Sequence, residues 1–234
     1  PLFSQVTKYV LFEHFTQASC GPCAAQNPGF QDDILAKNIG VVHHIAYHTS
    51  WPGVDPMNAY NPIEIGDRVT YYGVNSVPTI HMLGKYWSGS PAGVSQSMVN
   101  SETSKGSPIK ILVTESSDGT TRSVEVVVHT VGTPPSGSMK LRAAVVEEEI
   151  NYTTAPGNNG EKDFPNVFRK MLPNTTGDDY TAAAQGDSVV FNYSYTLDLA
   201  TWDTSRIYVI AFVQDETSGE VVNSGSTNDP KWNM

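Results

Sequence analysis

Two cysteines, Cys20 and Cys23, are the only ones in the chain, and a Gly-Pro dipeptide separates them in the stretch TQASCGPCAAQ. Such a pair can bind a metal, close a structural disulfide or exchange electrons with other thiols. A structural zinc site needs four ligands, normally two such pairs or one pair with two closely spaced histidines. This chain has one pair, and the adjacent His43 and His44 point to opposite faces of a predicted strand. We therefore expect no metal site and no cofactor.

The spacing and context of the pair favour thiol exchange. A disulfide stabilises a fold through the loop that it closes, and this loop is very short. A helix is predicted to begin at Cys20, where unpaired N–H groups and the positive end of the helix dipole stabilise a thiolate. We expect Cys20 to be the exposed nucleophile and Cys23, one turn later, to be the buried thiol that resolves a mixed disulfide. Pro22 suits the first helical turn, where its missing N–H costs nothing.

The composition is that of an acidic globular protein. The chain has 234 residues, more than a usual domain of about 100 to 150, so we expect two domains. A net charge of −10, without a basic cluster, argues against a nucleic-acid ligand. No apolar run approaches the roughly 18 residues of a membrane helix, and the chain opens without an export signal. We expect membrane contact only through a lipid anchor that has been removed.

The first segment, residues 1–106, alternates predicted strands and helices. The strands are VTKYVLFEHFT, GVVHHIAYHTS and VPTIHML, and GKYWSG is a hairpin. Helices are predicted from CGPC onward, in NPIEIGDRVTYYG and in SPAGVSQSMVNSETSKG. The second helix has a cap at Asn61, Pro62 in its first turn and Gly73 after its end. The predicted order is βαβαββα.

The second segment, residues 107–234, has the period-two pattern of β-strands. Six apolar stretches are separated by turns such as SDGT, VGTPPSGS and TSGE, which is typical of an antiparallel sandwich. The stretch from Asn151 to Tyr180 is too long for a plain hairpin, and we interpret it as a functional or packing loop. We place the boundary between the segments near Gly106 and Ser107.

The first segment resembles a thioredoxin-fold domain. The resemblance rests on CGPC, on the strand VLFEHFT before it and on NSVPTI, whose Val77 and Pro78 match the cis-proline element of that family. It implies that the Val77–Pro78 bond is cis, and that Pro78 lies against the dithiol and orients the partner. It also implies four positions for substrate contacts: Ser19, Gly21, Pro22 and Val77.

Two residues depart from the thioredoxin pattern. Ser19 replaces the Trp that usually precedes the first cysteine, which removes an aromatic lid. His14 stands six residues before Cys20, where thioredoxins carry a buried acid. An imidazole has an unperturbed pKa of about 6.5, so we interpret His14 either as the proton acceptor for Cys23 or as a packed histidine.

A closer resemblance covers nearly the whole chain. VLFEHFTQASCGPC, AYHTSWPGVDPMNAYNP, YYGVNSVPTIHMLG, DFPNVFRKMLP and YVIAFVQDETSGEVVNSG are similar to the 28-kDa outer-membrane-protein family of Bacteroidetes-type bacteria. That resemblance implies an exported protein of the periplasm, outer membrane or cell surface. It also implies an α/β thioredoxin-like domain in residues 1–106, followed by an all-β Ig-like sandwich in residues 107–234.

These observations lead to one functional hypothesis and two alternatives. The leading hypothesis is an enzyme, an extracytoplasmic thiol–disulfide oxidoreductase that acts on cysteine-containing proteins or a redox partner protein. The first alternative is an envelope or surface binding protein with a vestigial or regulatory dithiol. The second is a copper-handling protein, since Met57, Met82 and His81 could accompany the dithiol. Core packing explains these methionines more simply.

Two shorter stretches have their own interpretations. HTSWPGVDPMN, residues 48–58, is either a loop over the dithiol or a Pro/Gly-rich connection packed by Trp51. We interpret the acidic run Glu147, Glu148 and Glu149 as a solvated strand end rather than a cation site.

Overall fold

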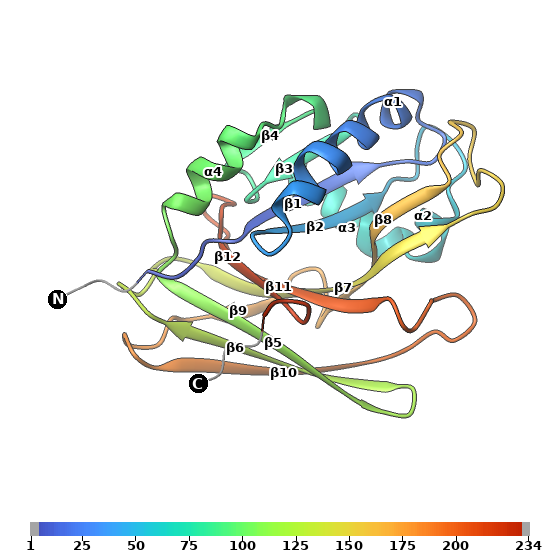
Figure 1. Ribbon diagram of the computed structural model, residues 1–234. Helices are drawn as coiled ribbons and strands as arrows, with labels where there is room; N and C mark the ends of the chain where they lie inside the picture. Colours follow the sequence, from blue (N-terminus) through green and yellow to red (C-terminus); the bar gives the residue numbers. More distant parts are fainter. Residues whose placement is uncertain (1–4, 231–234) are drawn as a thin grey trace.

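The first half of the chain forms four strands and four α-helices in the computed structural model, which describes residues 5–230 (Figure 1). A π-helix (Gln31–Leu35) and a 3-10 turn (Ala36–Asn38) extend the first helix. Gly73 ends the third helix with a φ of 65°, and Asn61 caps its start, so both predicted ends are confirmed. In chain order the elements are β1 (Val10–Thr16), α1 (Gly21–Phe30), β2 (Val42–His48), α2 (Pro56–Tyr60), α3 (Pro62–Tyr72), β3 (Thr79–Met82), β4 (Trp87–Gly89) and α4 (Gln96–Ser104).

The second half forms eight further strands. All six predicted strands are confirmed, but the stretch from Asn151 to Tyr180 is not one loop, because it holds two strands that we did not predict. Pro165 and Asn166, which has a φ of 55°, interrupt the apolar pattern of the longer one. The strands are β5 (Ile109–Asp118), β6 (Thr121–Thr130), β7 (Met139–Asn151), β8 (Asp163–Leu172), β9 (Asp178–Tyr180), β10 (Ser188–Thr196), β11 (Ile207–Asp215) and β12 (Val221–Ser226).

The expected fold class, a thioredoxin-like α/β domain followed by an all-β Ig-like sandwich, is wrong. One mixed sheet of nine strands draws on both halves in the order β12–β11–β7–β8–β2–β1–β3–β4, and β9 also pairs with β7. The halves meet where β2 and β8 run in parallel, with Ala46 opposite Val167. A second, three-stranded sheet, β10–β6–β5, lies below the large sheet in Figure 1.

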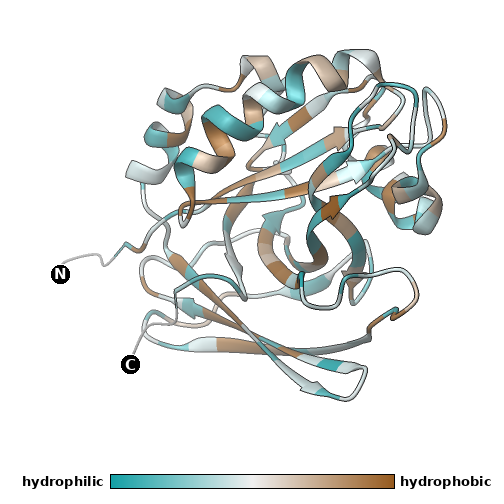
Figure 2. Cartoon of the chain, turned by 45° about the vertical axis from the view of Figure 1, so that its right-hand side comes forward, coloured by the Kyte–Doolittle hydropathy of each residue, from teal (hydrophilic) through white to brown (hydrophobic). Residues whose placement is uncertain are grey.

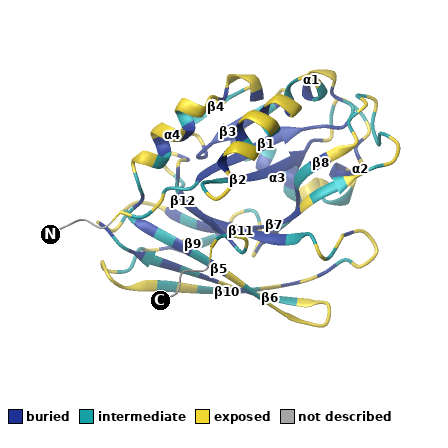
Figure 3. Cartoon of the chain, viewed as in Figure 1, coloured by how far each residue is buried: buried dark blue, intermediate teal, exposed yellow. Residues whose placement is uncertain are grey.

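The burial of the central strands explains this error. The residues from Tyr208 to Gln214 in β11 and from Leu141 to Glu147 in β7 are all buried. Continuous apolar runs of this kind are typical of strands that are covered on both faces. More and less exposed residues instead alternate along β6 and β10, because one face of their sheet meets solvent (Figure 3). In the sequence, both kinds of strand were interpreted as parts of one antiparallel sandwich.

We predicted that residues 1–106 and 107–234 are separately folding units, and this boundary stays a prediction. Its outer ends, residues 1–4 and 231–234, lie outside the described residues. The large sheet crosses this boundary, so the two segments share backbone hydrogen bonds as well as side-chain packing.

Apolar side chains fill the layers on both sides of the large sheet. Strand alternation turns Phe12 and His14 of β1 toward α1, and Glu13 and Phe15 toward α3. A second apolar cluster lies between the three-stranded sheet and strands β7 and β11. Figure 2 shows brown, hydrophobic segments along the strands, while hydrophobic and hydrophilic segments alternate along the outer helices.

A hydrogen-bonded cluster around a buried ion pair connects the two halves. Arg68 Nη2 of α3 donates to Glu13 Oε1 at 2.7 Å, and the two side chains are 1% and 0% exposed. The Tyr72 hydroxyl donates to the other carboxylate oxygen of Glu13. Gln214 Nε2 of β11 in turn donates to the Tyr72 hydroxyl at 3.1 Å. The pair therefore belongs to a hydrogen-bonded cluster that spans β1, α3 and β11.

We predict that Arg68→Met destabilises the protein by about 3–5 kcal/mol, because it leaves the Glu13 carboxylate buried and unpaired. The double variant Glu13→Gln/Arg68→Met should recover part of this loss, since it removes the orphaned charge. Urea unfolding of the three proteins measures both effects. Equal stability of the single and double variants would contradict this reading of the pair.

Candidate functional site

The two cysteines form a disulfide at the beginning of α1. The S–S distance is 2.08 Å, Cys20 is the N-cap residue, and Pro22 lies in the first helical turn, as predicted. The Cys23 N–H donates to Cys20 Sγ at 3.0 Å. The same N–H also donates to the Cys20 carbonyl at 3.1 Å. The beginning of the helix therefore directs a backbone donor and its positive dipole end at this sulfur.

Val77 and Pro78 lie beside the disulfide. The Val77–Pro78 peptide bond is cis, as the sequence predicted. The Val77 carbonyl oxygen lies 3.5 Å from Cys20 Sγ. The tertiary structure thus brings together two elements that are separated by more than fifty residues of sequence.

Both cysteines are buried, so the expectation of an exposed Cys20 is wrong for the disulfide form. Cys20 is 2% exposed and Cys23 is 0% exposed, whereas Gly21 and Pro22 between them are exposed. Two loops cover the chain just before the disulfide.

The first covering loop comes from residues 48–58. Gln17 Nε2 donates to the Gly53 carbonyl at 2.6 Å, and the Ser19 hydroxyl donates to the Val54 carbonyl at 2.8 Å. A Cβ atom on Gly53 would lie 2.7 Å from Ser19 Cβ, so only glycine allows this approach. These contacts are with the residues just before the disulfide, and the interpretation of this stretch as a loop over the dithiol itself stays a prediction. Ser19 therefore binds this loop to the chain just before Cys20.

The second covering loop, residues 152–162, joins β7 to β8 and is called the strap here. The Asn159 N–H donates to the Ala18 carbonyl at 3.2 Å, and the Asn158 N–H donates to the Ser19 hydroxyl at 3.0 Å. The Asn159 side chain donates to the carbonyls of Gln17, at 3.2 Å, and Cys20, at 3.1 Å. From the sequence we predicted only a long functional or packing loop, because the residues of the strap do not indicate which segment of the chain they contact.

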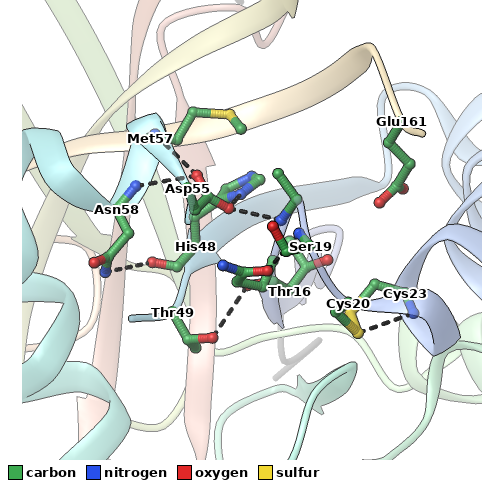
Figure 4. Close-up of polar contacts among 12 residues, drawn as sticks. Thr16, Ser19, Cys20, Cys23, His48, Thr49, Asp55, Met57, Asn58 and Glu161 are labelled. Atoms are coloured by element: carbon green, nitrogen blue, oxygen red, sulfur yellow. Dashed lines mark hydrogen bonds and ion pairs between the residues drawn. A yellow bond between two sulfur atoms is a disulfide. The ribbon is translucent and has the colours of Figure 1, made fainter. Parts of the chain in front are cut away.

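One buried carboxylate, Asp55, holds the surroundings of the disulfide in place (Figure 4). Its oxygens accept hydrogen bonds from the N–H groups of Ala18 at 2.7 Å and Met57 at 2.9 Å. His48 Nδ1 lies 2.7 Å from the same carboxylate. Burial by itself raises the pKa of Asp55, but His48 and these hydrogen bonds outweigh burial and hold the pKa below its usual value. Asp55 was not predicted from the sequence, although its position before Pro56 is that of a helix cap.

His14 lies on the α1 face of the sheet among aromatic rings. Its ring centre is 5.7 Å from that of Phe30, and its Nδ1 lies 3.3 Å from His44 Nε2. Its Nε2 is buried without a hydrogen-bond partner in the described part of the chain. Burial, together with His44 and His48, holds the pKa of His14 well below its usual value. His14 is therefore a neutral and weakly basic imidazole.

The other candidate positions have structural surroundings. Met57 and Met82 are buried in apolar clusters, as core packing predicted. Within residues 5–230, no three His, Cys, Asp or Glu side chains gather in the manner of a metal site. Glu147 is buried and pairs with Arg169 at 2.7 Å, so the interpretation of a solvated strand end is wrong for this residue.

Comparison with known proteins identifies the family. The sequence profile described as outer membrane protein Omp28 matches residues 68–228, which is more than half of the chain. The chain belongs to the Omp28 outer membrane protein family. The predicted resemblance is thereby confirmed, and this Omp28-family protein is extracytoplasmic, at the outer membrane. The matched region includes Val77, Pro78, the strap and both strands that flank it, while both cysteines precede it.

One solved structure shares the fold of this chain. HBP35 of Porphyromonas gingivalis is similar over 99% of this chain and 79% of its own, with a TM-score of 0.76 and 17% identity. A domain of the outer membrane lipoprotein Omp28 from Porphyromonas gingivalis is similar over 53% of this chain and 88% of its own, with a TM-score of 0.38 and 14% identity. A search of curated protein sequences gave no match. None of the helices in residues 5–230 is long and apolar enough to cross a membrane.

We predict that Asp55→Ala costs roughly 3 kcal/mol at pH 7, because it removes a helix cap and leaves buried donors unpaired. A carboxylate whose pKa is lower in the folded than in the unfolded state stabilises the fold at pH values above its unfolded pKa of about 3.9. This stabilisation is lost as the pH falls through the folded-state pKa. The difference from the parent should therefore shrink between pH 7 and pH 3 in urea unfolding. Asp118→Ala, at an exposed site, is the control. A loss that is equal at both pH values would refute this role of Asp55.

Gly157→Ala should loosen the strap, because its Cβ would lie 2.1 Å from the Ala18 carbonyl oxygen. If the strap limits the access of dithiothreitol to the disulfide, making its closed position less stable by about one to two kcal/mol should increase the rate of reduction. The expected increase is about 5–30-fold. Gly66→Ala is the matched control, since nothing lies within 4 Å of its added Cβ. Unchanged reduction of a folded Gly157→Ala protein would mean that the strap does not control access.

Proposed function

We propose that this Omp28-family protein is a thiol–disulfide oxidoreductase that acts on protein cysteines outside the cytoplasm. The observation that carries the proposal is the Cys20–Cys23 disulfide at the N-terminus of α1, with the Val77 carbonyl oxygen 3.5 Å from Cys20 Sγ. The substrates are cysteine-containing proteins or a redox partner protein, and the reaction needs no cofactor, because the dithiol itself carries the electrons.

Cys20 is the nucleophile in this proposal. In the reduced protein its thiolate is favoured by the Cys23 N–H, which points at Cys20 Sγ, and by the helix dipole. It attacks a disulfide of the partner, forms a mixed disulfide and releases one partner thiolate. Cys23, three residues along the same helix, then attacks Cys20 Sγ and releases the second partner thiolate. The reverse sequence oxidises a dithiol partner.

Neighbouring residues orient the partner. Pro78 holds the Val77 carbonyl toward Cys20, where it offers a hydrogen-bond acceptor to a partner backbone N–H. Gly21 and Pro22 are exposed beside the sulfur atoms and are proposed to contact the partner. The lowered pKa of His14 favours the packed-histidine alternative over a role as proton acceptor.

The burial of both cysteines favours a second candidate, an envelope or surface binding protein with a regulatory dithiol. Its disulfide would hold the covering loops in place without turning over. Two measurements separate the candidates: the reduction potential of the Cys20/Cys23 pair in a glutathione redox buffer, and the rate of exchange with a model protein disulfide. An oxidoreductase exchanges repeatedly with the substrate, whereas a regulatory disulfide is reduced without transferring electrons to it.

We predict that Cys23→Ser accumulates a mixed disulfide with substrate proteins, because the resolving thiol is missing, while Cys20→Ser accumulates far less. Non-reducing electrophoresis and mass spectrometry of the complexes measure both. Iodoacetamide at mildly acidic pH should label Cys20 faster than Cys23 in the reduced parent protein. Faster labelling of Cys23 would reverse the two assignments.

A further inference from the structure

The strap brings one carboxylate, Glu161, to the helix that carries the disulfide. Glu161 Oε1 accepts a hydrogen bond from Asn27 Nδ2 of α1 at 2.9 Å. Its other oxygen accepts one from the Asn159 side chain, which also donates to the Cys20 carbonyl. The carboxylate is thus tied to the disulfide-bearing turn from two sides, and Figure 4 shows it on the side of α1 where Cys20 and Cys23 lie.

Asn27, the partner of Glu161, shares one face of α1 with Cys23. Asn27 lies four residues after Cys23, and both are buried on the same face of α1. Side chains four residues apart are neighbours on a helix, with roughly 5–6 Å between their Cβ atoms. The hydrogen bond to Asn27 therefore holds the Glu161 carboxylate against the same face of α1 as Cys23, and proton exchange with the Cys23 thiol, directly or through water, is part of the proposal below.

We propose that Glu161 accepts the proton of the Cys23 thiol when the mixed disulfide is resolved, and returns it in the reverse reaction. This inference rests on the proposed oxidoreductase function. The Cys23 S–H bond breaks, and its proton passes to the Glu161 carboxylate. The Cys23 thiolate then forms a bond with Cys20 Sγ as the bond between Cys20 and the partner sulfur breaks. The partner sulfur leaves as a thiolate with the electron pair and takes a proton from Glu161 or water.

The surroundings of Glu161 suit this task better than those of His14. Burial raises the pKa of Glu161, the hydrogen bonds from Asn27 and Asn159 and the charge of His48 lower it, and Asp55 raises it, with a net upward result. A carboxylate with a raised pKa is a stronger base than an ordinary one and can exchange protons closer to neutral pH. Burial instead weakens His14 as a base.

The effect of the Glu161 charge on the Cys23 thiol can be measured without catalytic turnover. In a Cys20→Ser background, Cys23 is the only thiol, and its ionisation is followed by absorbance at 240 nm against pH. A nearby carboxylate opposes the thiolate, so Glu161→Gln should lower the pKa of Cys23. Glu125→Gln, at an exposed site of β6, controls for net charge. An unchanged Cys23 titration in Glu161→Gln would overturn the inference.

Stopped-flow kinetics test the proton transfer itself. With Cys20 intact, Glu161→Gln should slow resolution of the mixed disulfide about 10- to 100-fold and leave the first attack by Cys20 nearly unchanged. The parent rate should fall as acid protonates Glu161, and this inflection should be absent from the Gln variant. If Glu161→Gln does not fold, Glu161→Asp should retain the inflection with a slower rate.

Each outcome points to a separate conclusion. Equal resolution rates and equal pH profiles in the parent and Glu161→Gln overturn the role of Glu161 and leave the oxidoreductase proposal in place. A parent that forms no mixed disulfide at all overturns the oxidoreductase proposal, and the role of Glu161 with it.

Discussion

The surroundings of the disulfide depend on one buried carboxylate. Asp55 accepts hydrogen bonds from the chain just before Cys20 and from the first turn of α2, and it bonds to His48 at the end of β2. A charge taken out of water is tolerated only when such partners replace its hydration. Because three segments meet at this one group, the position of the turn before Cys20, and hence the start of α1, is set by β2 and α2.

Residues from both halves of the chain then close the site. Ser19 bonds to the Val54 carbonyl on one side and to the Asn158 N–H on the other, so it links the two covering loops. The strap can reach Ser19 because β8, which follows it, pairs directly with β2 in the large sheet. The second half of the chain therefore supplies part of the disulfide's cover, and the sheet that joins the halves is a condition for the site.

The closed cover influences the chemistry of the sulfur atoms. Burial disfavours a charged thiolate but imposes no such cost on a neutral disulfide. Closing the strap thus favours the oxidised pair, and thiolate chemistry gains from its opening. Glycines at Gly53 and Gly157 allow the close approach of both loops, because a side chain at either position would collide with the chain from Ala18 to Ser19.

The sequence alone determined the local features. The strand before the cysteines, the helix that begins at Cys20, the capped helix that ends at Gly73 and the cis bond at Pro78 were all predictable from short stretches of residues or from their resemblance to a family. Local patterns cannot show which strands pair. The fold class was therefore wrong, since doubly buried strands such as β7 and β11 were assigned to a sandwich, and β8 was missed. Only the tertiary structure decided the burial of Cys20 and the contacts of Asp55 and Glu161, because these arise where segments far apart in sequence meet across one sheet.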